Sequence, residues 1–164
     1  MTILRWAKRI ILMLLLLSGL LVLDYTLPNG RLVHVVGTEV KRVSQQVNGE
    51  EQTRDVYFIA ADDVEGGTTR VYRNEDAWIY LFKINSADIQ GQAQSLAQDD
   101  TKSPAILRYY GYRLQLFSMF PNVLTLERAE AGDQYTPWLR YGGFGIFGFL
   151  VLLFVFRFRY FVFD

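Results

Sequence analysis

The sequence predicts an α+β protein, in which a small antiparallel β-rich extracytoplasmic domain with one helix is flanked by two transmembrane helices. Two long apolar runs lie near the two ends of the 164-residue chain. Between them, short apolar and aromatic segments alternate with turn-forming residues, a pattern typical of strands. Charge is also segregated. Residues 24–140 hold 12 Lys and Arg against 16 Asp and Glu, whereas the two ends of the chain hold five basic residues and one acid.

The first apolar run has no charge from Ile10 to Leu23 and follows three basic residues in 1–9. Pro28 ends the helical pattern. A cleaved signal peptide opens in the same way, but no small-residue cleavage site follows this run. We therefore expect an uncleaved signal anchor, transmembrane helix 1, over 10–27.

Residues 28–137 predict the β-rich domain, with about six strands. A weak helical stripe of Ala87, Ile89, Ala93, Leu96 and Ala97 predicts one helix over 87–98, capped at Asn85–Ser86. Polar stretches at 44–53 and 62–67 are expected to be a loop and a turn. Candidate core residues near the end of the domain are Leu107, Tyr109, Leu114 and Leu116. The expected strands are 32–36 with a bulge or bend at Gly37 and extended chain over 38–43, then 55–60, 68–72, 78–84, 106–118 and 123–128.

The second apolar run predicts transmembrane helix 2 over 138–156. A buried helix of a soluble protein has a similar composition, but two such runs would leave little apolar sequence for a separate core. Residues 157–164 form an aromatic and basic tail, which we expect to anchor at the membrane interface. Its characteristic residues are Arg157, Phe158, Arg159, Tyr160, Phe161 and Phe163.

Basic residues beside membrane spans stay in the cytoplasm. The segments 1–9 and 157–164 carry such residues, so we expect both termini in the cytoplasm and the central domain outside, which is the periplasm if the membrane is the inner membrane of a Gram-negative bacterium. The lipid bilayer and other membrane protein subunits are therefore the expected partners.

Composition excludes several classes of function. The formal net charge is zero, which argues against a nucleic-acid partner. The chain has no cysteine and a single histidine, His34, so thiol catalysis and multi-histidine metal sites are excluded. No nucleotide-binding or hydrolase motif is present. We expect a protein that is not an enzyme and has no cofactor and no metal.

The best candidate for a ligand or partner contact is the polar segment between two expected strands, Tyr72, Arg73, Asn74, Glu75 and Asp76. The alternative is a structural turn in which the polar side chains bond nearby backbone. An enzymatic interpretation, with Glu75 or Asp76 as a base and Arg73 as an anion clamp, has no second catalytic group in its favour.

Three other features are weaker. Asp62, Asp63 and Glu65 lack calcium-loop spacing and are expected to form a solvated acidic loop. His34 is expected to be structural. Small residues at helical spacing in the two runs are typical of a helix-packing seam, either between the spans or with a partner. The alternative is that glycine is more common in membrane helices generally. The seam residues are Ser18, Gly19, Gly142, Gly145 and Gly148.

Several strings resemble a family of uncharacterised bacterial inner-membrane proteins, frequent in alphaproteobacteria, that carries a domain of unknown function. The most specific are Val71–Asp76 and Phe117–Asn122, and residues 35–40, 54–56 and 110–113 add to them. The resemblance implies the order of span, extracytoplasmic domain and span, and no known activity. The aromatic tail departs from it.

Two functional hypotheses follow from these patterns. The first is an accessory or assembly subunit that packs against a larger membrane complex, of which a bioenergetic complex is one kind. The alternative is an envelope ligand-binding or sensing module that uses the extracytoplasmic domain.

Overall fold

The computed structural model describes residues 2–47, 50–78, 80 and 83–157. The chain divides into two compact units, one made by residues 28–136 and the other by the two ends of the chain. The predicted α+β class is confirmed, with a five-stranded sheet and three helices in the described residues.

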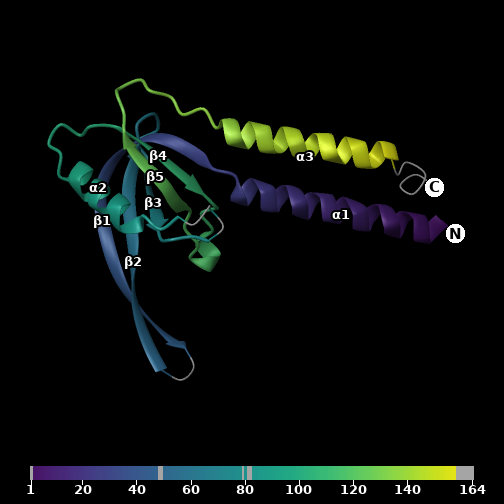
Figure 1. The fold of residues 1–164 in the computed structure, drawn as a ribbon, viewed down its shortest axis with the longest axis horizontal. Helices are drawn as coiled ribbons and strands as arrows, with labels where there is room; N and C mark the ends of the chain where they lie inside the picture. Colours follow the sequence, from purple (N-terminus) through teal and green to yellow (C-terminus); the bar gives the residue numbers. More distant parts are fainter. Residues whose placement is uncertain (1, 48–49, 79, 81–82, 158–164) are drawn as a thin grey trace. The chain divides into compact units, whose positions relative to one another are not determined.

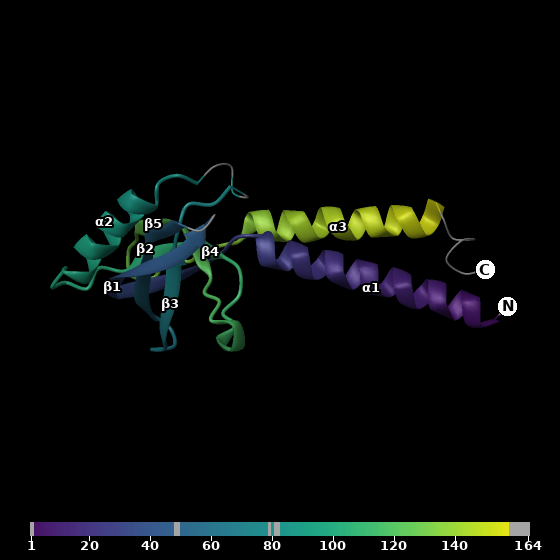
Figure 2. The same cartoon turned by 90° about the horizontal axis from the view of Figure 1, so that it is seen from below.

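The unit made by the chain ends holds α1 (Thr2–Thr26) and α3 (Trp138–Arg157). These two helices run side by side in both views (Figures 1 and 2). Trp6–Thr26 and Trp138–Arg157 are long and apolar enough to cross a membrane, and neither has its most apolar stretch buried within the protein. At about 1.5 Å per residue, α3 has the length of a bilayer core of roughly 30 Å.

The other unit is a closed barrel of five strands in the order β1-β2-β3-β5-β4. All neighbours pair antiparallel except β3 and β5, which are parallel. The helix α2 (Ser86–Ala97) lies between β3 and β4 in the chain. This order and the helix position are those of the OB fold, a five-stranded Greek-key barrel. The strands are β1 (Asn29–Val47), β2 (Glu50–Asp63), β3 (Thr69–Asn74), β4 (Ala105–Tyr110) and β5 (Asn122–Arg128).

The barrel interior and α2 share one hydrophobic core. Ile89, Ala93 and Leu96 recur on one face of α2 and are buried against the strands, as the helical stripe in the sequence predicts. The strands contribute the other core residues, which alternate along β1, β2 and β4; they are Val33, Val35, Ile59, Ala61, Tyr72, Ala105, Leu107, Tyr109, Val123 and Leu126. The predicted irregularity at Gly37 is confirmed, because the β1–β2 register shifts between Val35 and Gly37.

The prediction of a loop over 44–53 is wrong. β1 and β2 stay paired out to Val47 and Glu50, and they form a two-stranded arm that extends beyond the barrel (Figure 1). Backbone pairing between strands does not need apolar side chains, so the low apolar content of this stretch does not indicate its strands. Cross-strand ion pairs such as Arg42 with Asp55 add to the pairing.

Two predicted strands also need correction. In 78–84 the described residues form turns, and the only pairing is a bridge between Ala77 and Lys83. The strand predicted over 106–118 ends at Tyr110, because Gly111 takes a positive φ of 88° and turns the chain. Leu114 and Leu116 are therefore exposed by 41% and 89% and lie outside the core.

Candidate functional site

The predicted contact segment Tyr72–Asp76 forms the end of β3 and the first residues after it. Tyr72 and Asn74 point inward, with exposed fractions of 1% and 0%. The Tyr72 ring packs against Tyr109 at a centroid distance of 5.1 Å. Because strand residues alternate in direction, Arg73 and Glu75 keep part of their side chains in solvent.

Asn74 is the centre of a buried hydrogen-bond network. Its Nδ2 donates to the carbonyl of Ser86 at 2.7 Å and to Oε1 of Gln90 at 3.3 Å, both on α2. Its Oδ1 accepts from Nζ of Lys83 at 2.9 Å. The amide therefore joins the end of β3 to the first turn of α2 and to the segment before it.

Lys83 is 8% exposed, and its Nζ also donates to the carbonyl of Glu75 at 2.9 Å. Burial of the ammonium lowers the pKa of Lys83 to about 8, and the charges of Asp76 and Glu75 act in the opposite direction. A buried amine with a lowered pKa occurs in catalytic sites and in structural networks alike. Here Nζ donates to the Asn74 side chain and to the Glu75 carbonyl, both within the chain itself, which favours a structural role.

The same segment is bonded to β5 and to α2. The backbone N–H of Glu75 donates to Oδ1 of Asn122 at 2.9 Å, and Nδ2 of Asn122 donates back to the Glu75 carbonyl at 3.0 Å. Asn85 holds the N-cap position of α2, as predicted, but makes no side-chain cap bond; Asp76 instead accepts from the backbone N–H of Ser86 at 3.1 Å. Arg73 and Arg54 both pair with the Glu75 carboxylate.

These contacts make Tyr72–Asp76 a junction of β3, α2 and β5. Only the exposed parts of Arg73, Glu75 and Asp76 are open to a ligand or partner. The predicted role of this segment as a contact site stays a prediction.

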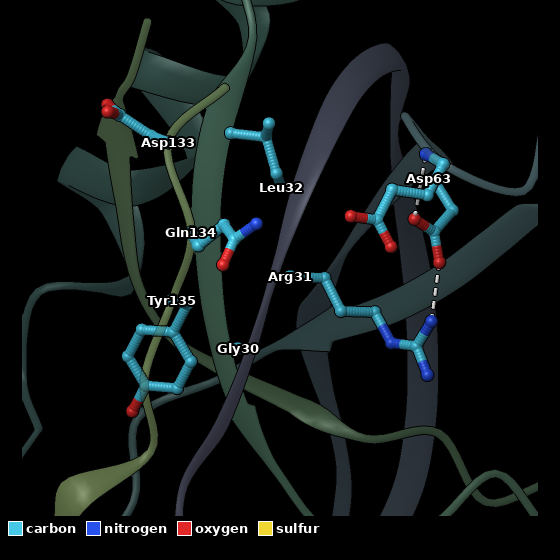
Figure 3. Close-up of a pocket in the computed structure, with 8 residues that line it drawn as sticks. Gly30, Arg31, Leu32, Asp63, Asp133, Gln134 and Tyr135 are labelled. Atoms are coloured by element: carbon cyan, nitrogen blue, oxygen red, sulfur yellow. Dashed lines mark hydrogen bonds and ion pairs between the residues drawn. The ribbon is translucent and has the colours of Figure 1, made fainter. Parts of the chain in front are cut away.

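A separate polar cavity of about 290 Å³ lies where β1 begins (Figure 3). Arg31 forms an ion pair with Asp63, and its Nε donates to the hydroxyl of Tyr109 at 3.2 Å. The bond to Tyr109 is the main cause of a raised pKa for Arg31. The segment after β5 completes the lining of the cavity. The lining residues are Gly30, Arg31, Leu32, Asp63, Glu65, Asp133, Gln134 and Tyr135.

Glycine at position 30 is required where β1 meets Tyr135 in the lining of this cavity. A Cβ on residue 30 would lie 2.4 Å from Cδ1 of Tyr135, so only glycine allows the ring to approach β1 so closely. The cavity is slightly smaller than typical ligand pockets and has more acidic than basic side chains, so cations and hydroxylated molecules suit it best.

Within the described residues, no group of three or more acidic or histidine side chains is placed to hold a metal ion. Asp62 accepts from the Thr69 hydroxyl at 2.6 Å, and Asp63 is paired with Arg31. His34 lies on β1 opposite Asp62 in the β1–β2 register, within the sheet. Asp62 and Asp63 thus have separate structural partners.

The helix pair has its own polar contact. Arg140 on α3 forms an ion pair with Asp24 on α1, and its Nη1 donates to the carbonyls of Asp24 and Leu27, each at 3.3 Å. A cation at these last carbonyls complements the C-terminal end of α1.

Of the predicted seam residues, Gly19 lies against Phe147, because a Cβ there would be 3.4 Å from the ring. A Cβ on Gly142, Gly145 or Gly148 would meet nothing within 4 Å. Ser18 donates to the carbonyl of Leu15 at 2.8 Å within α1. On α3, the glycine that lies close to the first segment is Gly143, against the side chain of Leu27 just after α1.

Sequence reasoning missed Lys83, Asn122, Arg31 and Gly143. A signal existed only for Asn122, which lies in the Phe117–Asn122 string; the others depend on pairings between distant segments. The predicted tail residues Phe158, Arg159, Tyr160, Phe161 and Phe163 lie outside the described residues.

Comparison with known proteins gives a family and no activity. Residues 4–162 match the family model described as "Protein of unknown function (DUF1523)". The chain is 31% identical over 133 residues to a protein of Haemophilus influenzae titled "Uncharacterized protein", which covers 73% of this chain and 75% of that protein. No solved structure matches.

Proposed function

Because this chain belongs to the DUF1523 family, a family of unknown function, we propose its role from its own geometry: a two-span inner-membrane protein that acts as a non-enzymatic accessory or assembly subunit of a larger membrane complex. Its OB-type barrel stands in the periplasm, and both termini are cytoplasmic.

One observation carries this proposal. Along α1 and α3, the membrane-length apolar segments are not buried by any described part of the protein. Leaving so many large apolar side chains in water is unfavourable by about 25 cal/mol for each Å² of apolar surface. A bilayer and neighbouring membrane helices are the surroundings that satisfy such a pair.

The distribution of charge supports the orientation. The basic residues of 1–9 and the Arg157 end of α3 favour the cytoplasm, and the segment between the helices is net acidic. Arg140, which would lie on the periplasmic side, is neutralised by its ion pair with Asp24.

The accessory role is supported by the surfaces left open. Gly142, Gly145 and Gly148 form a small-residue face of α3, where a Cβ would meet no described atom within 4 Å, and such a face suits close packing of a partner helix. The β1–β2 arm and the exposed parts of Arg73, Glu75 and Asp76 are further contacts that such a partner could use.

Native co-purification tests this role. The full chain, extracted from its own membranes in a mild detergent, should migrate with other membrane proteins that mass spectrometry identifies. Gly145→Ile should reduce their recovery, whereas the control Leu152→Ile, on a position without a small-residue requirement, should not. Migration of the wild-type chain alone at its own mass would contradict the proposal.

The alternative, a ligand-binding or sensing module, is favoured by the cavity beside Arg31 and Asp63. Small cationic or hydroxylated envelope molecules would be screened by thermal shift with the full chain in detergent. Stabilisation that disappears in Gln134→Ala would support it, and no stabilisation by any compound would count against it.

A further inference from the structure

The loop between β4 and β5, residues 111–121, presents apolar side chains that lie outside the hydrophobic core. It is short and internally bonded: Leu114 and Met119 exchange two backbone hydrogen bonds of 3.2 and 3.0 Å around a single 3-10 turn, Gln115–Phe117. At the tip, Leu116 and Phe117 are exposed by 89% and 69%. An apolar tip on an ordered loop is unusual on a surface that meets only water.

The loop is also held rigidly at its base. Arg113 donates to the carbonyl of Met119 at 2.9 Å and lies 3.9 Å from the centre of the Phe120 ring. Phe120 in turn packs edge-on against Phe58 of β2 at 5.2 Å. The tip is therefore fixed to the barrel, and its exposure is a property of the fold.

Strand pairing puts the base of this loop at the barrel end where the chain enters from α1. Tyr109, at the end of β4, is paired with Asn29, the first residue of β1. α1 ends at Thr26, so three Cα–Cα steps of about 3.8 Å separate that helix from Asn29. The chain that joins α1 to this end of the barrel is therefore at most roughly 11 Å long, so a membrane that contains α1 lies close to this end.

A second loop joins the first at the same end. The ring of Tyr80 lies 4.5 Å from that of Tyr110, which places the segment after β3 beside the end of β4. Trp78 and Ile84 on this segment are exposed by 85% and 80%.

Charge separates this surface from the rest of the domain. From Ala105 to Asn122 the chain has two arginines and no acid, although residues 24–140 as a whole are net acidic. Leu, Phe and Trp beside arginine are the composition of segments that enter the interface of anionic bilayers.

We infer that the β4–β5 loop docks on the outer leaflet of the membrane that α1 and α3 span, with Leu116 and Phe117 inserted at the level of the headgroups. Trp78 and Ile84 extend the same contact. The inference rests on the proposed membrane location of the two helices. It gives the barrel a third point of attachment, beside its chain connections to α1 and to α3, and so limits the motion of the barrel about those two connections.

Fluorescence quenching in vesicles tests this docking directly. Because the chain has no cysteine, Leu116→Cys and Phe117→Cys each supply a single thiol for a solvent-sensitive dye. The full-length variants are reconstituted in vesicles of phosphatidylethanolamine and phosphatidylglycerol. We expect several-fold stronger quenching by doxyl-labelled lipid than by aqueous iodide at both positions.

Two further variants make the result decisive. Ser95→Cys, on the exposed face of α2, should show the opposite preference, and Leu152→Cys on α3 should be quenched by doxyl lipid. If Leu152→Cys is not quenched, the membrane location itself is wrong. If it is quenched but both loop positions remain open to iodide, the docking inference alone is overturned. Protection of the loop only after solubilised native membrane proteins are added would assign it to a protein partner and would also overturn the inference.

Discussion

Lys83 provides a sharp test of the buried network, because its effect on stability should depend on pH. In the folded protein its pKa is lowered to about 8, whereas in the unfolded chain it is near 10.5. Between these values the unfolded state holds more protons, so the free energy of unfolding rises with pH. Linkage gives a rise of about 2 kcal/mol between about pH 7 and 9.5.

The variant Lys83→Met removes this titration. At pH 7 it loses the donor to Asn74 Oδ1, a cost of roughly 1–3 kcal/mol, but it also removes a buried charge, so the two effects largely offset. At higher pH only the wild type gains stability. The difference between the two proteins should therefore shift by about 2 kcal/mol in favour of the wild type.

Urea unfolding of the full chain in detergent, followed by the near-ultraviolet circular dichroism of the tyrosines, measures this difference. Lys102→Met, at an exposed lysine, is the control and should follow the wild type at every pH. The pH range of the measurement stops below 10. Burial raises the pKa of Tyr72 in the folded protein, so above that pH the tyrosine ionises first in the unfolded chain, and the free energy of unfolding falls for a reason separate from Lys83. Parallel pH curves for wild type and Lys83→Met would refute the buried-amine account.

Four further substitutions have clear expected outcomes. Gly30→Ala should destabilise the barrel by about 1–3 kcal/mol in urea unfolding, because its methyl group collides with the Tyr135 ring; unchanged stability would contradict the close approach. Tyr72→Phe should stabilise by about 1 kcal/mol in the same assay, since no described residue bonds the buried hydroxyl, and a clear loss would reveal a partner. Arg140→Leu should lower the melting temperature in detergent, and Asp24→Asn should lower it less because the carbonyl bonds of Arg140 survive; equal losses would argue against those bonds.

Local patterns were sufficient for elements that depend on local chemistry. The stripe of Ile89, Ala93 and Leu96 predicts α2, and glycine at 37 predicts the irregularity in β1. The strand at 123–128 also lies within one residue of β5. In each case, periodicity or backbone preference decides the structure before distant contacts matter.

Features that depend on distant pairing could not be predicted. The β1–β2 arm forms from polar residues because backbone bonds between the strands do not require apolar side chains. Leu116 resembles a core residue in sequence, yet the turn at Gly111 carries it out of the barrel. The closure of the sheet rests on the pairing of β1 with β4 and of β3 with β5, which no local pattern specifies.

The candidate site shows the same division. Tyr72–Asp76 stood out as a polar segment, but its role as a junction depends on Lys83 and Asn122, which approach it only through the fold. Arg140 was visible as a charge beside a span, whereas its partner Asp24 lies on the other helix.

The central claim is that the barrel stands outside the cytoplasmic membrane while the ends of the chain remain inside. Single thiols tested with a membrane-impermeant maleimide in intact cells measure this directly, because the natural chain has no cysteine to react. The account predicts that Asp100→Cys, on the exposed segment before β4, is labelled in intact cells with a permeabilised outer membrane, and that Lys8→Cys is labelled only after lysis. Labelling of Lys8→Cys in intact cells, or protection of Asp100→Cys until lysis, would contradict it.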